Sequence, residues 1–508
     1  RTVTPGLIDA HVHLYLSGAL TSGIPGLADN LRANLAWGVL GVADLGAPES
    51  IFDLRDRIDD GELPGPRIFA TGPFLTAPGS HPCETFNDPQ QCRFVGEDGT
   101  AAELVGALSR ADGIKVALAD ADFTPWPTPR LDLADLLSIT TAAPQPVFAH
   151  TDTPTDMADA LSSGVDVLAH PVFSESGAPA PDAPVTSTLG AFRGTDDLLS
   201  GALLGDDLTF TNDDVVADWQ AIFDNPRLLS GGWREHAPQW SDAAAANLEA
   251  WHQAGTPIIA GSDAGYWFVP HGLGLIRELE GLVELGLSPA EALAAATSAP
   301  AELLGWTDSG FVAPGYRADL LVLSADPTVS ISALRETEQI WLRGVPLVPG
   351  ELVPTSPGTS ACVAADDCPD GQRCDVDRWT CADVCDVPGA VVDDCGADAC
   401  VETSAGEAVC RSFASCSLLH QDCAPSWYGE NCVPVDIDTN ACWPGGPGLA
   451  GDSCGWTGAA DACAPGLFCS WVDSRCYTHC DTAAPVCPDG LSCVDQVVEG
   501  QSWFGLCL

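Results

Sequence analysis

Short apolar runs alternate with amphipathic stretches over the first 316 residues, and this pattern restricts the fold more than any other feature. The stretches between the runs have helical patterns, such as those at Ile51–Asp60 and Ala101–Ala111. Such alternation is typical of a parallel α/β sheet, in which helices connect neighbouring strands. Eight strand-like runs can be counted: Thr4–His11, Val39–Asp44, Arg67–Thr71, Ile114–Ala117, Pro146–His150, Val165–His170, Pro184–Leu189 and Pro257–Ser262. They predict an α/β fold of the (β/α)8, TIM-like barrel type.

Residues that commonly bind metals lie at the ends of several of these runs. His11 and His13 end the first run, and side chains two positions apart on a strand point to the same face. His150 ends the fifth run, His170 ends the sixth, and Asp263 follows the eighth. For His11 and His13 alone, an accidental pair on a surface strand is an alternative. Because function gathers at the carboxyl ends of barrel strands, the whole set predicts a metal centre there.

Lys115 is the only lysine among the 20 lysine and arginine residues of the chain. It lies in the fourth run, within Asp112-Gly-Ile-Lys-Val116. An arginine stays protonated at ordinary pH, whereas a lysine amine can lose its proton when it is desolvated. This contrast indicates a chemical role for Lys115, the alternative being a lysine left over under biased residue usage.

Together these motifs resemble the amidohydrolase superfamily, and within it the imidazolonepropionase-like branch that includes metal-dependent Xaa-Pro dipeptidases. The resemblance extends from Pro5 to about Leu347. Its motifs are Pro-Gly-Leu-Ile-Asp-Ala-His-Val-His-Leu (5–14), Gly-Pro-Arg-Ile (65–68), Asp-Gly-Ile-Lys-Val (112–116), Gly-Ser-Asp-Ala-Gly (261–265), Arg-Glu-Leu-Glu (277–280), Leu-Ser-Pro-Ala-Glu-Ala-Leu (287–293) and Ala-Pro-Gly-Tyr-Arg-Ala-Asp-Leu-Leu-Val-Leu (313–323).

The resemblance implies a centre of two divalent metal ions. Zinc suits histidine and carboxylate ligands, and manganese or cobalt would also fit. The implied ligands are His11, His13 and Asp263 for the more buried ion, His150 and His170 for the other, and Lys115 as a bridge. Lys115 would carry carbon dioxide as a carbamate, whose two oxygens can each hold one cation.

The activity implied by the resemblance is hydrolysis of an amide, peptide or cyclic C–N bond in a small or dipeptide-like substrate. A hydroxide between the two ions would attack the carbonyl, with Asp263 carrying the proton to the leaving nitrogen. His81, in Pro78-Gly-Ser-His-Pro82, matches a family loop that reaches the substrate, although a surface histidine is the alternative. Arg193 and Arg234 are candidates to pair with a substrate carboxylate.

Two other functions remain open from the sequence. The same centre could hydrolyse an ester, a lactone or a phosphotriester, because these reactions differ in the leaving group rather than in the ligands. The chain could also be a non-catalytic surface binding protein with a relic barrel, but a relic would be expected to lose ligands.

The cysteines divide the chain into two parts. Cys83 and Cys92 flank the His81 loop and could connect its ends, while the other 20 of the 22 cysteines lie between Cys362 and Cys507. This density predicts a disulfide-rich module of a secreted or extracytoplasmic protein, rather than a metal–thiolate array. Its spacing is repeated, since Cys-x5-Cys-x6-Cys-x3-Cys occurs at 368–385 and again at 463–480. The module resembles the Cys-rich tails of myxobacteria-like secreted proteins and could bind a surface partner.

These observations predict four parts: a barrel at 1–316, the last strands of a small β-sandwich at 317–348, a proline-rich linker at 349–360 and the Cys-rich module at 361–508. Family members carry a longer segment before the His-x-His motif, which completes the sandwich. Here only residues 1–4 precede the motif at 5–14 that contains it, so the sandwich is expected to be incomplete or the sequence to be a fragment. The long acidic segment Ser174–Trp240 is expected to cover the barrel mouth.

The formal net charge of −51 argues against nucleic acid or anionic membranes as partners, because like charges repel. The sequence has no run of apolar residues long enough to predict a membrane span.

Overall fold

The structure is a computed structural model, and it describes residues 1–347 apart from 21–26, 62–64, 84–90, 119–127 and 230. The side chains of 28 and 231–233 are also outside the description. Between 348 and 508 it describes the backbone of short strands alone. Contacts between Cα atoms divide the chain into two units, one formed by residues 1–84 and 88–355 and the other mainly by residues 356–508. The linker predicted at 349–360 lies outside the described residues.

All eight predicted strands occur at the expected places. They are β2 (Leu7–Val12), β3 (Val39–Asp44), β4 (Arg67–Ala70), β7 (Ile114–Leu118), β8 (Val147–Thr151), β9 (Val167–Leu168), β10 (Val185–Thr186) and β11 (Ile258–Ile259). Every residue of β2, β3 and β7 is buried, as expected for parallel strands that are covered on both faces. Two short strands were not predicted, β5 (Phe74–Thr76) and β6 (Cys92–Phe94).

The parallel strands form two sheets rather than one closed ladder. One has the order β2-β3-β4 and the other the order β11-β10-β9-β8-β7-β5-β6. The predicted α/β fold with a parallel sheet is therefore confirmed, whereas a continuous barrel ladder is not seen. The ladder is interrupted at the third predicted strand, where β4 pairs with β3 and the separate strand β5 pairs with β7, and again between β2 and the two-residue strand β11.

The outer edges of the two sheets, β2 and β11, nevertheless lie side by side. The Ala10 amide donates to the Ala260 carbonyl at 3.0 Å, and Val12 bridges Ala264 beyond the end of β11. One hydrophobic cluster also takes side chains from strands of both sheets, including Ile8 of β2 and Phe148 of β8. The two sheets thus enclose one core.

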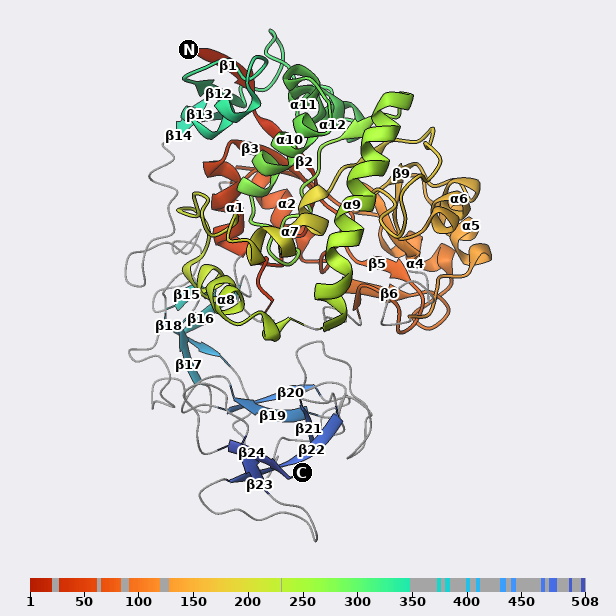
Figure 1. Cartoon of the computed structure of the whole chain (residues 1–508), viewed down its shortest axis with the longest axis vertical. Helices are drawn as coiled ribbons and strands as arrows, with labels where there is room; N and C mark the ends of the chain where they lie inside the picture. The colour runs from red at the N-terminus through yellow and green to blue at the C-terminus, as the bar shows by residue number, and fades with distance from the viewer. Residues whose placement is uncertain are drawn as a thin grey trace. The chain divides into compact units, whose positions relative to one another are not determined.

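Helices cover the outside of the strands, and α9 is the longest of them (Figure 1). The helices are α1 (Leu27–Ala36), α2 (Ile51–Asp59), α4 (Ala101–Ala107), α5 (Leu133–Ala142), α6 (Pro154–Ser162), α7 (Leu189–Leu199), α8 (Asp213–Asp224), α9 (Gly231–Ala254), α10 (Leu273–Glu284), α11 (Pro289–Ala295) and α12 (Ser298–Leu303). Capping boxes at Thr100, Thr153 and Ser288 fix the starts of α4, α6 and α11. Among the described residues, no helix combines the length and apolar character that a membrane span requires.

The acidic segment 174–240 is largely helical. It contains β10, α7, α8, the short 3-10 helix η2 (Pro226–Leu228) and the beginning of α9. The apolar side chains of Trp219 and Phe268 are buried in a cluster that anchors α8 to the loop after β11.

A separate antiparallel sheet has the order β1-β12-β13-β14 and occupies one end of this unit (Figure 1). Its strands are β1 (Thr2–Pro5), β12 (Leu320–Leu323), β13 (Thr337–Leu342) and β14 (Val345–Leu347), with η3 (Ile331–Arg335) between β12 and β13. The predicted strand Thr4–His11 therefore divides, since residues 2–5 belong to this sheet and residues 7–12 to the parallel one. The strands expected after the barrel join β1 here.

The Cys-rich segment contains antiparallel strand pairs, and in five of them a cysteine stands directly opposite another. The pairs of strands are β15 (Gln372–Asp375) with β16 (Thr380–Asp383), β17 (Ala399–Glu402) with β18 (Ala408–Arg411), β19 (Glu430–Pro434) with β20 (Asn440–Pro444), β21 (Leu467–Ser470) with β22 (Arg475–Asp481), and β23 (Cys493–Asp495) with β24 (Phe504–Cys507). The opposed residues are Cys374 and Cys381, Cys400 and Cys410, Cys432 and Cys442, Cys469 and Cys476, and Cys493 and Cys507.

We predict that each opposed pair forms a disulfide in the oxidised protein. Directly opposite residues of antiparallel strands have Cα atoms about 4.5–5.5 Å apart, within the range that a disulfide spans. Digestion of the unreduced, alkylated protein followed by mass spectrometry should recover the five cross-strand pairs. Recovery of these ten cysteines mainly as alkylated free thiols, or joined to other partners, would contradict the register.

Candidate metal centre

The first three predicted ligands meet where the edges of the two sheets adjoin. His11 lies in β2, His13 follows it, and Asp263 lies in the turn after β11. The Asp263 amide donates to the His11 carbonyl at 2.8 Å, and the His13 amide donates to the Ala264 carbonyl at 2.8 Å. One Asp263 carboxylate oxygen, Oδ1, lies 3.4 Å from His11 Nε2 and 3.2 Å from His13 Nε2. One potential ligand atom from each residue lies within 4.8 Å of the others, and all three residues are buried.

The turn that carries Asp263 requires its flanking glycines. A Cβ on Gly261 would lie 2.8 Å from His11 Cβ, and a Cβ on Gly265, whose φ is +97°, would lie 2.3 Å from the His13 carbonyl oxygen. Any larger residue at these positions would push Asp263 away from the histidines. The Gly-Ser-Asp-Ala-Gly motif at 261–265 therefore has glycines where its backbone closely approaches that of residues 11–13.

Each histidine of the centre has one ring nitrogen fixed by a neighbour. His11 Nδ1 lies 2.8 Å from the Ala169 carbonyl, and His13 Nδ1 lies 3.2 Å from the Gly46 carbonyl. A carbonyl can only accept, so Nδ1 carries the proton in both rings and Nε2 presents a lone pair. This tautomer is the one that binds a metal ion through Nε2.

The two histidines expected at the second ion also have one ring nitrogen each engaged by a neighbour. His170 Nδ1 lies 3.0 Å from the Thr188 hydroxyl, which leaves Nε2 available. His150 Nε2 lies 2.8 Å from an Asp152 carboxylate oxygen, which leaves Nδ1. Their ring centroids are 4.6 Å apart, and the His170 ring is 4.7 Å from that of His11. The five predicted imidazole and carboxylate ligands thus lie in one continuous group.

Burial lowers the pKa of His11, His150 and His170 and favours their neutral, metal-binding form. The pKa of His11 lies well below its usual value, first because of burial and then because of the Lys115 charge. The pKa of His170 also lies well below its usual value, through burial and the neighbouring His150. For Asp263, burial raises the pKa, but His11, His13 and Lys115 outweigh it and leave the pKa below its ordinary value.

Lys115 lies on β7 and is 1 % exposed. Burial lowers its pKa to about 7 against the opposing attraction of Asp263, so much of the amine is neutral at neutral pH. Its Nζ lies 5.6 Å from the centre of the Phe74 ring, which in turn stacks on His13 at 5.9 Å. Lys115 therefore lies next to the group of histidines, on the strand that pairs with β8, which carries His150.

The donor set fits a metal ion because its central atoms lack partners. In the described part of the chain, His11 Nε2, Asp263 Oδ1 and Lys115 Nζ are buried without a hydrogen bond. Buried polar atoms normally find a partner, and leaving one unpaired costs about 1–3 kcal/mol. The imidazole nitrogen and the carboxylate oxygen are donors that zinc prefers, whereas the Lys115 amine would supply donors only as a carbamate. The assignment of individual ligands remains a prediction.

Sequence reasoning missed the residues that hold these ligands. Asp9 accepts hydrogen bonds from the Ser262 amide at 2.9 Å and hydroxyl at 2.5 Å, which fixes the turn before Asp263. Burial raises the pKa of Asp9 to about 7. Asp44 accepts from the Gly46 amide at 3.1 Å and so places the carbonyl that binds His13. Asp9 and Asp152 each lie two residues from a predicted ligand, a spacing that could have indicated them.

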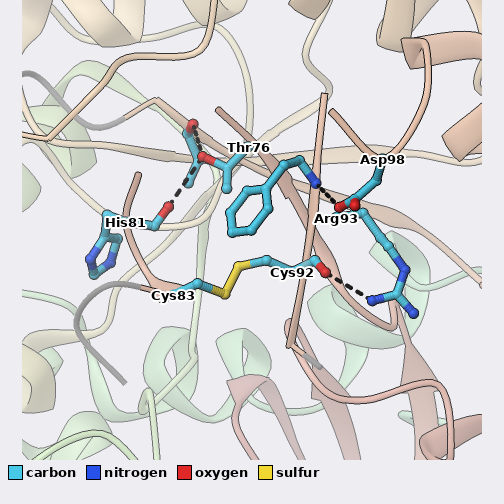
Figure 2. Close-up of a disulfide and its surroundings, with 8 residues drawn as sticks. Thr76, His81, Cys83, Cys92, Arg93 and Asp98 are labelled. Carbon is cyan, nitrogen blue, oxygen red and sulfur yellow. Dashed lines mark hydrogen bonds between the residues drawn. A yellow bond between two sulfur atoms is a disulfide. The ribbon is translucent and has the colours of Figure 1, made fainter. Parts of the chain in front are cut away.

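His81 lies beside the centre, with its ring centroid 4.8 Å from that of His150. Its carbonyl accepts a hydrogen bond from the Thr76 hydroxyl at 3.2 Å, and a disulfide between Cys83 and Cys92 follows directly along the loop (Figure 2). The disulfide packs with Phe74, the ring that both Lys115 and His13 approach. It thus supports both the His81 loop and one wall of the centre.

We predict that removing this disulfide by Cys83→Ala with Cys92→Ala loosens the loop without altering the ligands. Closing a loop of nine residues is worth about 2–3 kcal/mol, so amide exchange at 76–83 and 91–95 should accelerate on the order of 30- to 100-fold. Hydrogen exchange with mass spectrometry measures this, and α12 serves as the internal control. Unchanged exchange around the loop would show that the disulfide does not hold it.

The two arginines that could pair with a substrate carboxylate differ in the structure. Arg193 Nη1 lies 3.3 Å from a Glu284 carboxylate oxygen and is engaged there. Arg234 Nε is buried and has no hydrogen bond within the described residues. Of the two candidates, Arg234 retains an uncommitted donor.

Comparisons with known proteins find relatives of the α/β unit. The sequence profile of the amidohydrolase family matches residues 239–346, which include Asp263. A search of the curated proteins finds no match. Among solved structures, a candidate prolidase from Bifidobacterium longum is 27% identical with a TM-score of 0.52, over 72% of this chain and 84% of that chain.

Two further solved structures share the fold. A Xaa-Pro dipeptidase with methionine bound in its active site is 23% identical with a TM-score of 0.53, covering 68% of this chain and 87% of that one. A bottromycin amidohydrolase is 21% identical with a TM-score of 0.51, covering 69% and 78%. Residues 239–346 therefore match the amidohydrolase family, and the fold that the α/β domain shares with a candidate prolidase supports a hydrolase that acts on carbon–nitrogen bonds.

Proposed function

We propose that this enzyme binds two divalent metal ions, zinc in the first instance, and cleaves an amide bond of a small, dipeptide-like substrate. We further propose that its two parallel sheets act as one (β/α)8 barrel whose mouth carries the site. The observation that supports this most directly is the group of unpartnered buried atoms, His11 Nε2, Asp263 Oδ1 and Lys115 Nζ. The similarity to a candidate prolidase supports a dipeptide-like substrate.

The residues of the chain would divide the work between holding ions and moving a proton. His11, His13 and Asp263 would hold one ion, and His150 and His170 the other. Bound ions would polarise the substrate carbonyl and lower the pKa of a water molecule. Asp263 Oδ1 would accept the proton from the attacking water and pass it to the leaving nitrogen. His81, beside His150, would contact the substrate.

Lys115 would join the two ion sites as a carbamate. Its neutral amine would attack carbon dioxide, and loss of one proton would leave a carboxylate with two oxygens. The amine is buried and its pKa is about 7, so neutral amine is available at physiological pH. An ammonium or a guanidinium could not form this group.

This role predicts a pH dependence for reconstitution of the metal-free protein. Below pH 7 the Lys115 amine becomes protonated, so formation of the carbamate should slow by about tenfold for each further pH unit. The measurement is zinc uptake at several pH values with the dissolved carbon dioxide held constant. Lys115→Met supplies the background of pH-dependent zinc binding by the histidines. Equal uptake by the two proteins across pH 6–8 would contradict carbamate formation.

The experiment that tests the proposed function combines metal analysis with a substrate screen. The purified full-length protein should contain about two zinc ions per chain and should hydrolyse members of a panel of dipeptides and N-acyl amino acids. Turnover confined to lactones, esters or phosphotriesters would instead favour those reactions at the same centre. Absence of bound metal after incubation with zinc would favour a binding protein. We also propose secretion of the chain, which the density of cysteines in the Cys-rich segment motivates.

A further inference from the structure

Thr188, the residue before helix α7, contacts a predicted metal ligand instead of capping the helix. Thr188 precedes the helix with φ +41° and ψ +38°, and its side chain makes no capping hydrogen bond. A threonine at this position normally accepts from an amide of the first helical turn. Here its hydroxyl instead lies 3.0 Å from His170 Nδ1, on the ring expected to bind the second ion.

Glu278 caps the helix in place of Thr188. It lies on α10 and is 1 % exposed, and its two carboxylate oxygens accept from the Leu189 amide at 2.9 Å and the Gly190 amide at 3.0 Å. These are the first two amides of α7, which have no partner within the helix. A buried carboxylate at a helix N-terminus is also favoured by the helix dipole. One side chain thus satisfies both amides from another helix.

The same turn of α7 packs against the Asp263 turn. A Cβ on Gly190 would lie 2.9 Å from the Ser262 carbonyl oxygen, so glycine is needed for this approach. The Thr188 amide also donates to the Gly261 carbonyl at 2.9 Å. The start of α7 is therefore held between Glu278 on one side and the turn that carries Asp263 on the other.

We propose that Glu278 is a positioning residue of the metal centre that acts through Thr188 on His170. By capping α7, Glu278 leaves the Thr188 hydroxyl available to accept from His170 Nδ1. That hydrogen bond orients the ring and keeps Nε2 directed to the ion. The inference rests on the proposed function, and it gives a role to the Glu278 of the Arg-Glu-Leu-Glu motif.

The test compares zinc affinity in full-length Glu278→Gln and Glu280→Gln variants. Glutamine at 278 keeps one acceptor but places an amide group against the second helix amide. Loss of a partner that orients a ligand typically weakens metal binding about 10- to 100-fold. Titration against a competing chelator should show that loss for one of the two ions in Glu278→Gln. Glu280 lies on the same helix and pairs with Arg335 at 2.7 Å, so Glu280→Gln should bind zinc like wild type.

A second pair of variants tests the connection through Thr188. Thr188→Ser retains the hydroxyl and should bind zinc with wild-type affinity. Thr188→Val lacks the hydroxyl, and its zinc affinity should fall by the same factor as in Glu278→Gln. The double variant should lose no more than the larger single loss, because both act on one bond. Additive losses, or wild-type zinc affinity in Thr188→Val, would overturn the inference even if Glu278→Gln fails to fold. Absence of zinc from the wild-type protein would instead overturn the proposed function.

Discussion

Replacing Lys115 by alanine should remove the second metal ion and nearly all turnover. Lys115 is buried on β7 beside the histidines, and its Nζ has no hydrogen bond within the described residues. If its carbamate joins the two ion sites, alanine leaves the His150–His170 site without its negatively charged ligand. Metal content by mass spectrometry and turnover of the best substrate from the screen measure the two losses.

The loss can be assigned to the chemistry of Lys115 rather than to a cavity. Lys115→Met keeps most of the side-chain volume but cannot form a carbamate, so it should lose metal and turnover as Lys115→Ala does. Short carboxylic acids should restore part of the activity of Lys115→Ala, because alanine leaves room for a carboxylate. Wild-type metal content and turnover in Lys115→Met would remove Lys115 from the centre.

The strand positions could be predicted, and candidate ligands could be named, because both depend on local sequence. Apolar runs bounded by turns define parallel strands, and the residues after such strands meet at one edge. The closure of the sheets could not be predicted in the same way. It depends on how β4 and β5 divide their pairing between the two sheets and on how the β2 and β11 edges meet, which are decided by packing in three dimensions.

The residues that hold the ligands were predictable only where they lie close to them in sequence. Asp9 precedes His11 by two residues and Asp152 follows His150 by two. Glu278, in contrast, is 89 residues from Leu189, whose amide it binds. Sequence alone gives no reason to connect α10 with the start of α7, or Thr188 with His170.

Replacing Asp263 by asparagine should separate its two proposed roles. Asparagine keeps the size of the side chain and one oxygen donor, and it tolerates the left-handed backbone at this position, where φ is +60°. The turn should therefore fold, and metal binding should be weakened but not abolished. The proton acceptor is lost, so turnover should fall by the roughly 10²- to 10⁴-fold typical of a general acid–base group.

The pH profile of the wild-type enzyme provides the matching control for Asp263. His11, His13 and Lys115 keep the pKa of Asp263 below its ordinary value, so the carboxylate stays ionised at neutral pH. Activity should fall on the acid side as the coupled site takes up a proton, and this value belongs to the site rather than to one residue. In metal-loaded Asp263→Asn the residual rate should depend less on pH there, because the acceptor is gone. Near-normal turnover in that variant would mean that Asp263 holds an ion and that another group moves the proton.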